Sequence, residues 1–268
     1  MKQIPNLFTL LNLILGAIAI ILILQPGETI VIMDDGGATQ VNLPEKIWIG
    51  AIFIFAAAVI DFLDGFLARL LNAHSEMGKQ LDSLSDVVSF GVAPGMILYQ
   101  LLRIGFAREE GGLDVSVVAL LPAFIFPAAV AWRLAKFNVS TTQKYDFEGV
   151  PSPAAALVVA SFPLIILYRY FDIQELFINS WFLYLVILVL SFLMVSRMRF
   201  MAMKFTDFSF QKNSLKFILI ILSVLAITFM QWLAVPVIFI LYVIISLISK
   251  PAGTAVRSET TETKEITV

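Results

Sequence analysis

The sequence predicts an all-α integral membrane protein, a polytopic helix bundle with about eight transmembrane helices. Hydrophobic residues make up 59% of the 268 residues and charged residues only 14%, with a mean hydropathy of +0.91. Soluble domains carry about 25% charged residues, so this composition indicates a chain that lies mainly in lipid. The sequence has no cysteine, which excludes a disulfide framework, a thiolate metal site and a catalytic thiol.

The predicted helices follow one another along almost the whole chain. A spanning helix needs about 20 mostly apolar residues, and this length fits the segments 7–24, 47–71, 84–102, 115–136, 153–170, 178–196, 214–231 and 234–249. The first segment is predicted to be a helix and not a signal peptide, because it exceeds the roughly 7–15 apolar residues of a signal core. Residues 1–250 thus form one membrane domain, and the polar tail 251–268 is predicted to be disordered.

The distribution of basic residues predicts that both termini are cytoplasmic. Cytoplasmic connections of membrane proteins retain positive charge. With the amino terminus inside, only Lys46, Arg103, Arg108 and Arg169 of the 18 basic residues lie on the outer side. The basic inner loop 197–216 also contains aromatic residues, and we expect it to attract anionic lipid headgroups and not nucleic acid.

The first outer connection, residues 25–46, contains a pattern typical of a hairpin. Apolar and polar residues alternate on both sides of the run Asp34–Gly37, whose residues tolerate a tight turn. The segment is expected to form either a small external β-hairpin or an irregular loop.

Four aspartates are the most unusual feature of these apolar segments. Asp61 and Asp64 lie three residues apart near the end of the second predicted helix, and Asp82 and Asp86 lie four apart near the start of the third. Residues at these spacings share one helix face. The connection between the two helices is short, so we expect them to be antiparallel neighbours that bring the four carboxylates together.

Carboxylates in spanning segments require a compensating cation, because each costs on the order of 2.5–3.5 kcal/mol on insertion scales. Arg69 and Lys79 are the nearby basic residues, and they are too few for four acids. Clustered oxygen ligands suit hard divalent cations such as Mg²⁺, Mn²⁺ or Ca²⁺. The sequence therefore predicts a divalent-metal site near the cytoplasmic face.

The run 61–86 reads D-x2-D-G-x2-A-R-x8-G-x3-D-x3-D, with its fixed positions filled by Asp61, Asp64, Gly65, Ala68, Arg69, Gly78, Asp82 and Asp86. The pattern resembles the signature of the CDP-alcohol phosphotransferases, and no fixed position departs from it. Enzymes of that family displace CMP from a CDP-linked lipid or alcohol with the help of divalent metal. The resemblance also implies a homodimer.

The same resemblance implies a role for each fixed residue. The implied metal ligands are Asp61, Asp64, Asp82 and Asp86. Asp86 is also the implied general base, which takes the proton of the attacking hydroxyl. The residues implied to lie against or near the cytidine nucleotide are Gly65, Ala68, Arg69 and Gly78. The implied cofactor is Mg²⁺ or Mn²⁺ as two ions, since a diphosphate adds negative charge to an acidic site.

The resemblance extends to the runs "IPNLFTLLNLILG", "DSLSDVVSFGVAPG", "RLAKFN" and "FEGVPSPAAA". Over these runs the chain is similar to the membrane-embedded phosphatidylserine synthases of bacteria and archaea, a branch of that family. The implied substrates are CDP-diacylglycerol and L-serine. The implied location is the inner membrane of a prokaryote, with the active site facing the cytoplasm.

Candidate residues for substrate binding are Arg133, Lys136, Asn138, Asn6 and Thr9. The two cations lie three residues apart and either hold the serine carboxylate or anchor the helix at the headgroups. The two polar residues of the first helix share a face with Asn12, and they either contact the nucleotide or form interhelical hydrogen bonds. Ser152, at the start of the fifth helix, is expected to cap that helix.

Two other functions fit parts of the pattern. The same chemistry with glycerol phosphate or inositol phosphate as the acceptor would also require cations at positions 133 and 136. A metal-ion or proton-coupled transporter would also carry membrane carboxylates, but transporters place them near the midplane at broken helices. Here the acids are predicted near one face of the membrane, which favours the enzyme.

Overall fold

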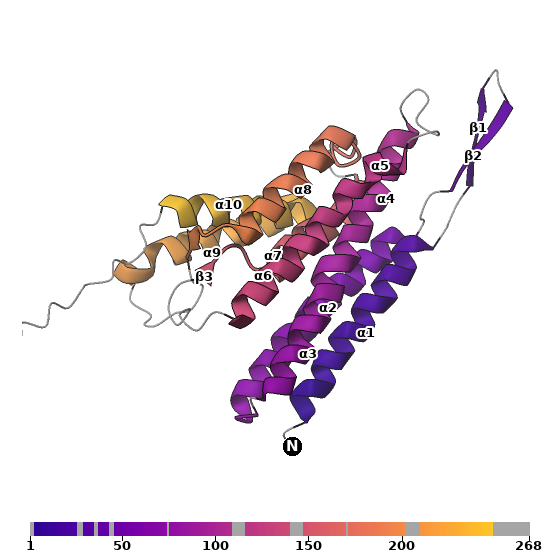
Figure 1. Ribbon diagram of the computed structural model, residues 1–268. Coiled ribbons are helices and arrows are strands. Elements are labelled where there is room, and N and C mark those ends of the chain that lie inside the picture. The colour runs from indigo at the N-terminus through magenta and orange to yellow at the C-terminus, as the bar shows by residue number, and fades with distance from the viewer. Residues whose placement is uncertain are drawn as a thin grey trace, which may run out of the picture.

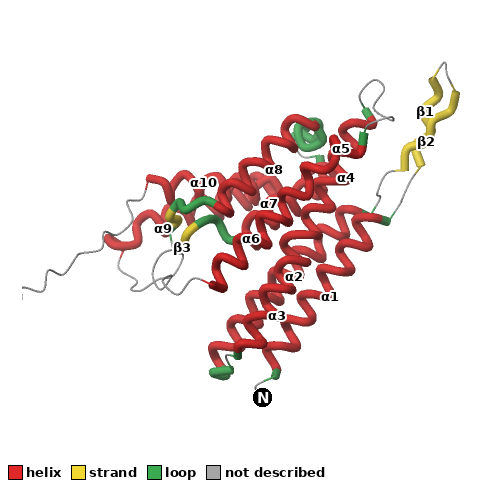
Figure 2. The backbone as a smooth tube through the Cα atoms, viewed as in Figure 1, coloured by secondary structure: helices red, strands yellow, loops and turns green. Residues whose placement is uncertain are grey.

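The computed structural model is a bundle of helices with two small strand pairs (Figure 1; Figure 2). It describes residues 3–25, 29–34, 37–42, 46–73, 75–108, 116–139, 147–169, 171–201 and 210–248. The α-helices of these residues are α1 (Ile4–Leu24), α2 (Ile47–Leu70), α3 (Glu76–Asp86), α4 (Ala93–Ala107), α5 (Val117–Leu120), α6 (Ile125–Val139), α7 (Ser152–Tyr168), α8 (Ser180–Val195), α9 (Phe210–Met230) and α10 (Ala234–Ile248). The predicted tail 251–268 and residues 202–209 of the basic loop 197–216 lie outside the described residues.

Within the part of the chain that the structure describes, five apolar helical stretches are long enough to cross a membrane, which confirms the predicted class of fold. They are Ile4–Leu24, Ile47–Leu70, Glu76–Ala107, Val117–Val139 and Asn213–Ile248. The shorter apolar helices α7 and α8 add to these stretches. The last stretch contains both α9 and α10, which are joined by the 3-10 turn η4 (Gln231–Leu233) and pack against each other. The count of eight separate spans and the side on which the termini lie stay predictions.

Three α-helices of the bundle have a proline at their first or second position. Pro5, Pro94 and Pro153 occupy the first turns of α1, α4 and α7. Proline has no N–H to donate, and the first turn of a helix has no acceptor for one. Pro5 and Pro153 therefore start helices without the loss of a main-chain hydrogen bond, whereas Pro94 lies inside a continuous helical stretch, directly after a π-helical segment.

The continuous stretch Glu76–Ala107 is the central helix of the bundle. Its most apolar window is 61% buried, against 17–33% for the other four stretches. Between α3 and α4 lies the π-helical segment η1 (Val87–Val92). A π-turn inserts one extra residue and rotates the helix that follows. The acidic face of α3 and the core-facing side of α4 are thereby set at different angles. The core-facing side of α4 includes Ile97, Leu98 and Leu101, which are fully or almost fully buried.

Two short antiparallel strand pairs accompany the helices of the described residues. Strands β1 (Thr29–Asp34) and β2 (Gly37–Asn42) pair antiparallel from Thr29 with Asn42 to Asp34 with Gly37, which confirms the hairpin alternative for the first outer connection. The hairpin extends away from the bundle, at the end opposite the amino terminus (Figure 1). The short strands β3 (Phe147–Glu148) and β4 (Arg199–Phe200) pair beside the start of α7.

Gly149 is required by the turn that joins β3 to α7. Its φ of +73° is in the left-handed region, and a Cβ there would overlap the main-chain oxygen of Met194. We expect Gly149→Ala to lower the free energy of unfolding by about 1–3 kcal/mol, the cost of a strained backbone position. Thermal unfolding in detergent measures this loss. The variant Ala154→Gly, in the following helix, should lose only about 1 kcal/mol, and a smaller loss at Gly149 than at Ala154 would contradict the prediction.

Candidate active site

The candidate site is a cavity lined by residues from the start of α1, the end of α2 and the start of α3. These three helix ends lie at the same end of the bundle (Figure 1). Its volume is about 440 Å³. Its lining residues come from all three helices and from the turn between α2 and α3: Pro5, Asn6, Thr9, Asp61, Phe62, Asp64, Gly65, Ala68, Arg69, Ala73, Ser75, Gly78, Lys79, Asp82 and Asp86. The cavity therefore collects every fixed position of the predicted signature.

A short reversal places α2 and α3 side by side. Asn72 takes a left-handed conformation with φ of 48° and ends α2, which is a common way to close a helix. Ser75 begins α3 as its N-cap, because its hydroxyl accepts a hydrogen bond of 2.9 Å from the N–H of Gly78. Local signals in the connection thus produce the antiparallel pair that the sequence predicts.

Helix α1 is held against this pair by three polar contacts. The Thr9 hydroxyl donates to Asp64 Oδ2 at 2.8 Å. The hydroxyls of Ser85 and Ser89 donate to the main-chain oxygens of Thr9 and Asn12, at 3.0 and 2.9 Å. Thr9 thus forms an interhelical bond and also lines the cavity, whereas the Asn6 amide donates to Gln3 at 2.9 Å.

The four aspartates converge as predicted. Carboxylate oxygens of Asp61, Asp64 and Asp82 lie within 4.8 Å of one another, and the carboxyl of Asp86 is within hydrogen-bonding reach of Asp61. Asp64 and Asp86 are only 4% and 7% exposed. Like charges so close together in a spanning segment repel one another strongly unless a cation or proton lies between them.

The donor set fits a hard divalent cation. It consists of carboxylate oxygens from two helices, which is the ligand type that Mg²⁺ and Mn²⁺ prefer. Asp86 Oδ1 is buried and has no hydrogen-bond partner, so a coordination position remains open on this carboxylate. The acidic cluster is therefore able to hold metal.

The small residues of the signature have two different surroundings. A Cβ at Gly78 would lie 2.9 Å from Asn6 Oδ1 and 3.0 Å from Ser75 Oγ, so this glycine permits the close approach of α1. A Cβ at Gly65 would meet only the guanidinium of Arg69, at 3.6 Å. Gly65 therefore leaves open space in the cavity and does not serve packing between helices.

The candidate acceptor residues of α6 lie outside the lining of the cavity. Arg133 is close enough to Asp86 for their charges to interact, and it donates to Ser152 Oγ at 3.2 Å. Lys136 forms an ion pair of 2.9 Å with Glu148. Of the two cations, Arg133 is thus the one whose charge interacts with an acid of the cluster.

Asn138 connects α6 to α3. Its amide donates to Ser83 Oγ at 2.7 Å, and its main-chain oxygen accepts from Lys79 Nζ at 3.3 Å. Asn138 therefore contacts the helix of the acidic cluster through Ser83 and through Lys79, which lines the cavity, but Asn138 is not itself a lining residue.

Several residues of the site differ from the sequence prediction or were missed by it. Ser152 was expected to cap α7, but Pro151 is the N-cap and the Ser152 side chain binds Arg133. Lys79, which the sequence marked only as a basic residue near the four acids, lines the cavity itself. Tyr242 of α10 lies near Arg133, and no motif marks it because more than 100 residues separate the two positions.

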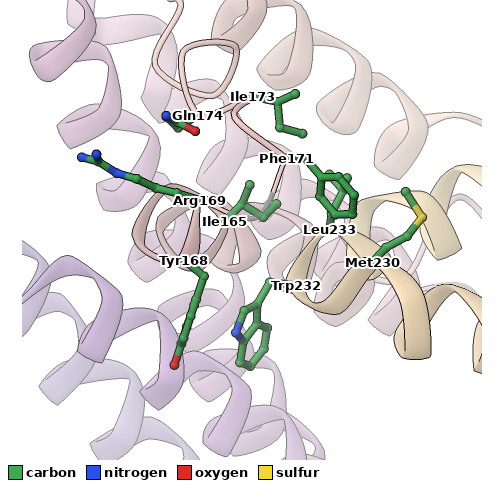
Figure 3. Close-up of a pocket in the computed structure, with 9 residues that line it drawn as sticks. All are labelled: Ile165, Tyr168, Arg169, Phe171, Ile173, Gln174, Met230, Trp232 and Leu233. Atoms are coloured by element: carbon green, nitrogen blue, oxygen red, sulfur yellow. The ribbon is translucent and has the colours of Figure 1, made fainter.

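A second, much smaller cavity lies at the carboxyl end of α7 (Figure 3). Its walls are the end of α7, the turn that follows and the η4 connection, with Tyr168, Arg169 and Trp232 among the lining residues. None of the residues that line it is acidic. It therefore lacks the donor set of the first cavity.

A comparison with protein families decides which family of enzymes this site belongs to. The model of the CDP-alcohol phosphatidyltransferases matches residues 2–186. The chain belongs to the CDP-alcohol phosphatidyltransferase family. The resemblance drawn from the acidic signature is thereby confirmed, and the family match includes every residue that lines the cavity.

Similar proteins with a curated name lie within the same family. The chain is 32% identical to the CDP-diacylglycerol–serine O-phosphatidyltransferase of Helicobacter pylori over 250 residues, which are 91% of this chain and 89% of the relative. It is 33% identical to the protein of that name from Bacillus subtilis, over 60% of this chain and 77% of the relative. It is 35% identical to the archaetidylserine synthase of Methanothermobacter thermautotrophicus, over 42% of this chain and 45% of the relative.

Proposed function

We propose that the protein transfers the phosphatidyl group of CDP-diacylglycerol to the hydroxyl of L-serine, with phosphatidylserine and CMP as products. The proposal rests chiefly on one observation, the acidic cavity with Arg133 near enough to Asp86 for their charges to interact. It is supported by the names of relatives that match up to 91% of the chain. An acceptor that carries both a hydroxyl and a carboxylate fits a base and a guanidinium in the same region of the site.

Asp61, Asp64 and Asp82 would hold Mg²⁺ or Mn²⁺, as two ions, with Asp86 as a further ligand. Bound there, the ions would offset the charge of the diphosphate and of the departing CMP. The residues of this chain would then place the donor lipid. Gly65 and Ala68 would lie against the cytidine nucleotide, with Arg69 and Gly78 close by.

Asp86 would act as the general base. The serine oxygen attacks the phosphorus that carries the diacylglycerol, and the bond from that phosphorus to the CMP oxygen breaks. The hydroxyl proton passes to the carboxylate of Asp86, whose Oδ1 has no other hydrogen-bond partner. Arg133 would hold the serine carboxylate, so that the hydroxyl points toward Asp86.

The membrane arrangement of residues 1–250 is part of the same proposal. We place the cavity at the cytoplasmic face of a prokaryotic inner membrane, because the basic residues of the chain concentrate in the connections at that face. Both termini and the tail 251–268 would lie on the same side. Anionic headgroups would surround the site, and the protein would be a homodimer, as the family resemblance implies.

The experiment is incorporation of labelled acceptor into lipid by purified protein with CDP-diacylglycerol and Mg²⁺ or Mn²⁺. Serine should be incorporated with one CMP released for each phosphatidylserine, whereas glycerol phosphate and inositol phosphate should not. Incorporation of one of these phosphates in place of serine would reject the acceptor. Absence of CMP release with all three would reject the enzyme and favour a transporter.

A methyl group at position 65 tests the proposed nucleotide contact. Gly65→Ala should raise the KM for CDP-diacylglycerol by about 10-fold, because poorly fitting bulk in a packed site costs about 1–3 kcal/mol. The melting temperature should stay unchanged, since the added Cβ has no packing neighbour besides Arg69. Initial rates at varied donor and at varied acceptor concentration measure the effect. An unchanged donor KM would contradict a nucleotide at this position.

A further inference from the structure

The helices α9 and α10 lie beyond the residues matched by the family model, yet α10 approaches the acceptor side of the site. We infer that Tyr242 of α10 is a positioning residue, which orients Arg133 through the strand pair β3–β4 and so determines the affinity for the acceptor. The inference rests on the proposed function, because it assumes that Arg133 holds the acceptor.

Tyr242 is fixed at both its hydroxyl and its ring. The hydroxyl donates to the main-chain oxygen of Met201 at 3.2 Å. The ring stacks on Phe200, with 6.1 Å between the ring centroids and 23° between the planes. Tyr242 also packs against a buried cluster of Val150, Leu193 and Phe200. The side chain thus joins α10 to the end of β4.

Strand β4 in turn fixes the segment that enters α7. Phe200 pairs with Phe147, and Arg199 pairs with Glu148. The N–H groups of Gly149 and Val150 then donate to the main-chain oxygens of Met198 and Leu193, at 2.9 and 3.1 Å. Each residue from 147 to 150 is therefore held by a main-chain partner next to β4 or at the end of α8.

The same segment touches α6 at two points. Glu148 pairs with Lys136 at 2.9 Å, and Ser152 accepts from Arg133 Nη1 at 3.2 Å. Arg133 and Lys136 lie three residues apart, on one face of α6. The segment 147–152 thus lies along α6, and the arginine is attached to it directly. The ion pair of Lys136 with Glu148 fixes the register of this contact.

Arg133 is left with hydrogen-bonding capacity that points to an anion. Its Nε is buried and has no hydrogen-bond partner, and no salt bridge within the described ranges includes it. It lies near both Asp86 and Tyr242. A guanidinium binds a carboxylate best as a planar fork in a fixed orientation. A side chain that is already held in place loses less conformational entropy when the acceptor binds.

The test is the variant Tyr242→Phe, which keeps the stacked ring and removes only the hydroxyl. We expect the KM for the acceptor to rise about 3–10-fold, the range of one lost hydrogen bond. The kcat and the KM for CDP-diacylglycerol should stay within about 2-fold, because the donor cavity is untouched. The matched control is Tyr184→Phe, which also removes a hydroxyl that donates to a main-chain oxygen, that of Ala119 at 2.6 Å, and it should leave both KM values unchanged.

Ser152→Ala provides a second route to the same result. It removes the hydroxyl that binds Arg133 and should produce the same rise in acceptor KM without a rise in donor KM. A double-mutant cycle then separates positioning from direct contact. If Tyr242 acts through Arg133, Tyr242→Phe should have no further effect on acceptor KM in an Arg133→Lys background.

Three results would overturn the inference: an unchanged acceptor KM in Tyr242→Phe, an equal rise in both KM values, or independent effects in the cycle. The wild-type protein tests the proposed function separately, by which acceptor it uses. If it uses a phosphorylated acceptor in place of serine, the ratio of variant to wild-type KM for that acceptor still decides the inference.

Discussion

Asp86→Asn is expected to lower kcat for CMP release by about 10²–10⁴-fold, the range of general acid–base catalysis. The amide has almost the shape of the carboxylate but cannot take a proton from the attacking hydroxyl. The variant should fold, because Asp86 is 7% exposed next to other acids and loses a buried charge by the change. Release of CMP at saturating donor and acceptor, together with the melting temperature, measures both expectations.

Asp172→Asn is the matched control for this change. Asp172 lies in the turn after α7 and binds the Gln174 amide at 2.9 Å, far along the chain from the acidic cluster. It should retain full turnover. Equal activity of Asp86→Asn and the wild-type protein would remove Asp86 from the mechanism and leave the metal site as a separate question.

Asp82→Asn is expected to raise the concentration of Mg²⁺ or Mn²⁺ needed for half-maximal turnover by at least about 10–100-fold. Asp82 is one of the three carboxylates whose oxygens lie within 4.8 Å of one another. Chelation with excess EDTA should abolish CMP release by the wild-type protein, and Mn²⁺ should restore it. Titration of the activity with each metal measures the difference between the two proteins.

Thermal stability gives the same prediction a readout that needs no turnover. A ligand that binds only the folded state raises stability with its concentration, so the wild-type melting temperature should rise with Mn²⁺ more than that of Asp82→Asn. In EDTA the Asp82→Asn variant should have the higher melting temperature, because it has one fewer charge in a crowded acidic cluster. A wild-type protein that keeps its turnover and its melting temperature in EDTA would contradict a metal site.

The helices and the acidic cluster were predictable because their signals are local. Long apolar segments form helices in lipid, where every main-chain group needs an internal partner. Asp61 and Asp64 share a face by spacing alone, as do Asp82 and Asp86. The reversal between them begins at Asn72 and ends at Ser75, two residue types that close and open helices. The sequence therefore predicted both the pair of helices and the meeting of their carboxylates.

The π-helical segment η1 was outside the reach of this reasoning. Its residues, Val87–Val92, lie within one segment that was predicted to be a single regular helix, and α1, α6 and α7 of the bundle pack against it. The number of separate spans is similarly undecided by hydropathy, because α9 and α10 form one apolar stretch that η4 interrupts.

The surroundings of Arg133 were also predicted only in part. Its charge and its place near the inner end of a helix marked it as a candidate from the sequence. The sequence did not indicate that Lys136, three residues later, would pair with Glu148, or that Ser152 would bind Arg133 and not cap its own helix. These partners lie on different helices and strands, where no periodicity relates one position to the other.

The class of protein, the family and the residues of the acidic cluster could all be inferred from the sequence, because apolar length and residue spacing along one helix follow directly from chain geometry. The side chains that surround Arg133, Tyr242 of α10 among them, became known from the folded structure. Contacts between distant segments depend on how whole helices pack, and that packing is the sum of many weak contacts that no single stretch of the chain encodes.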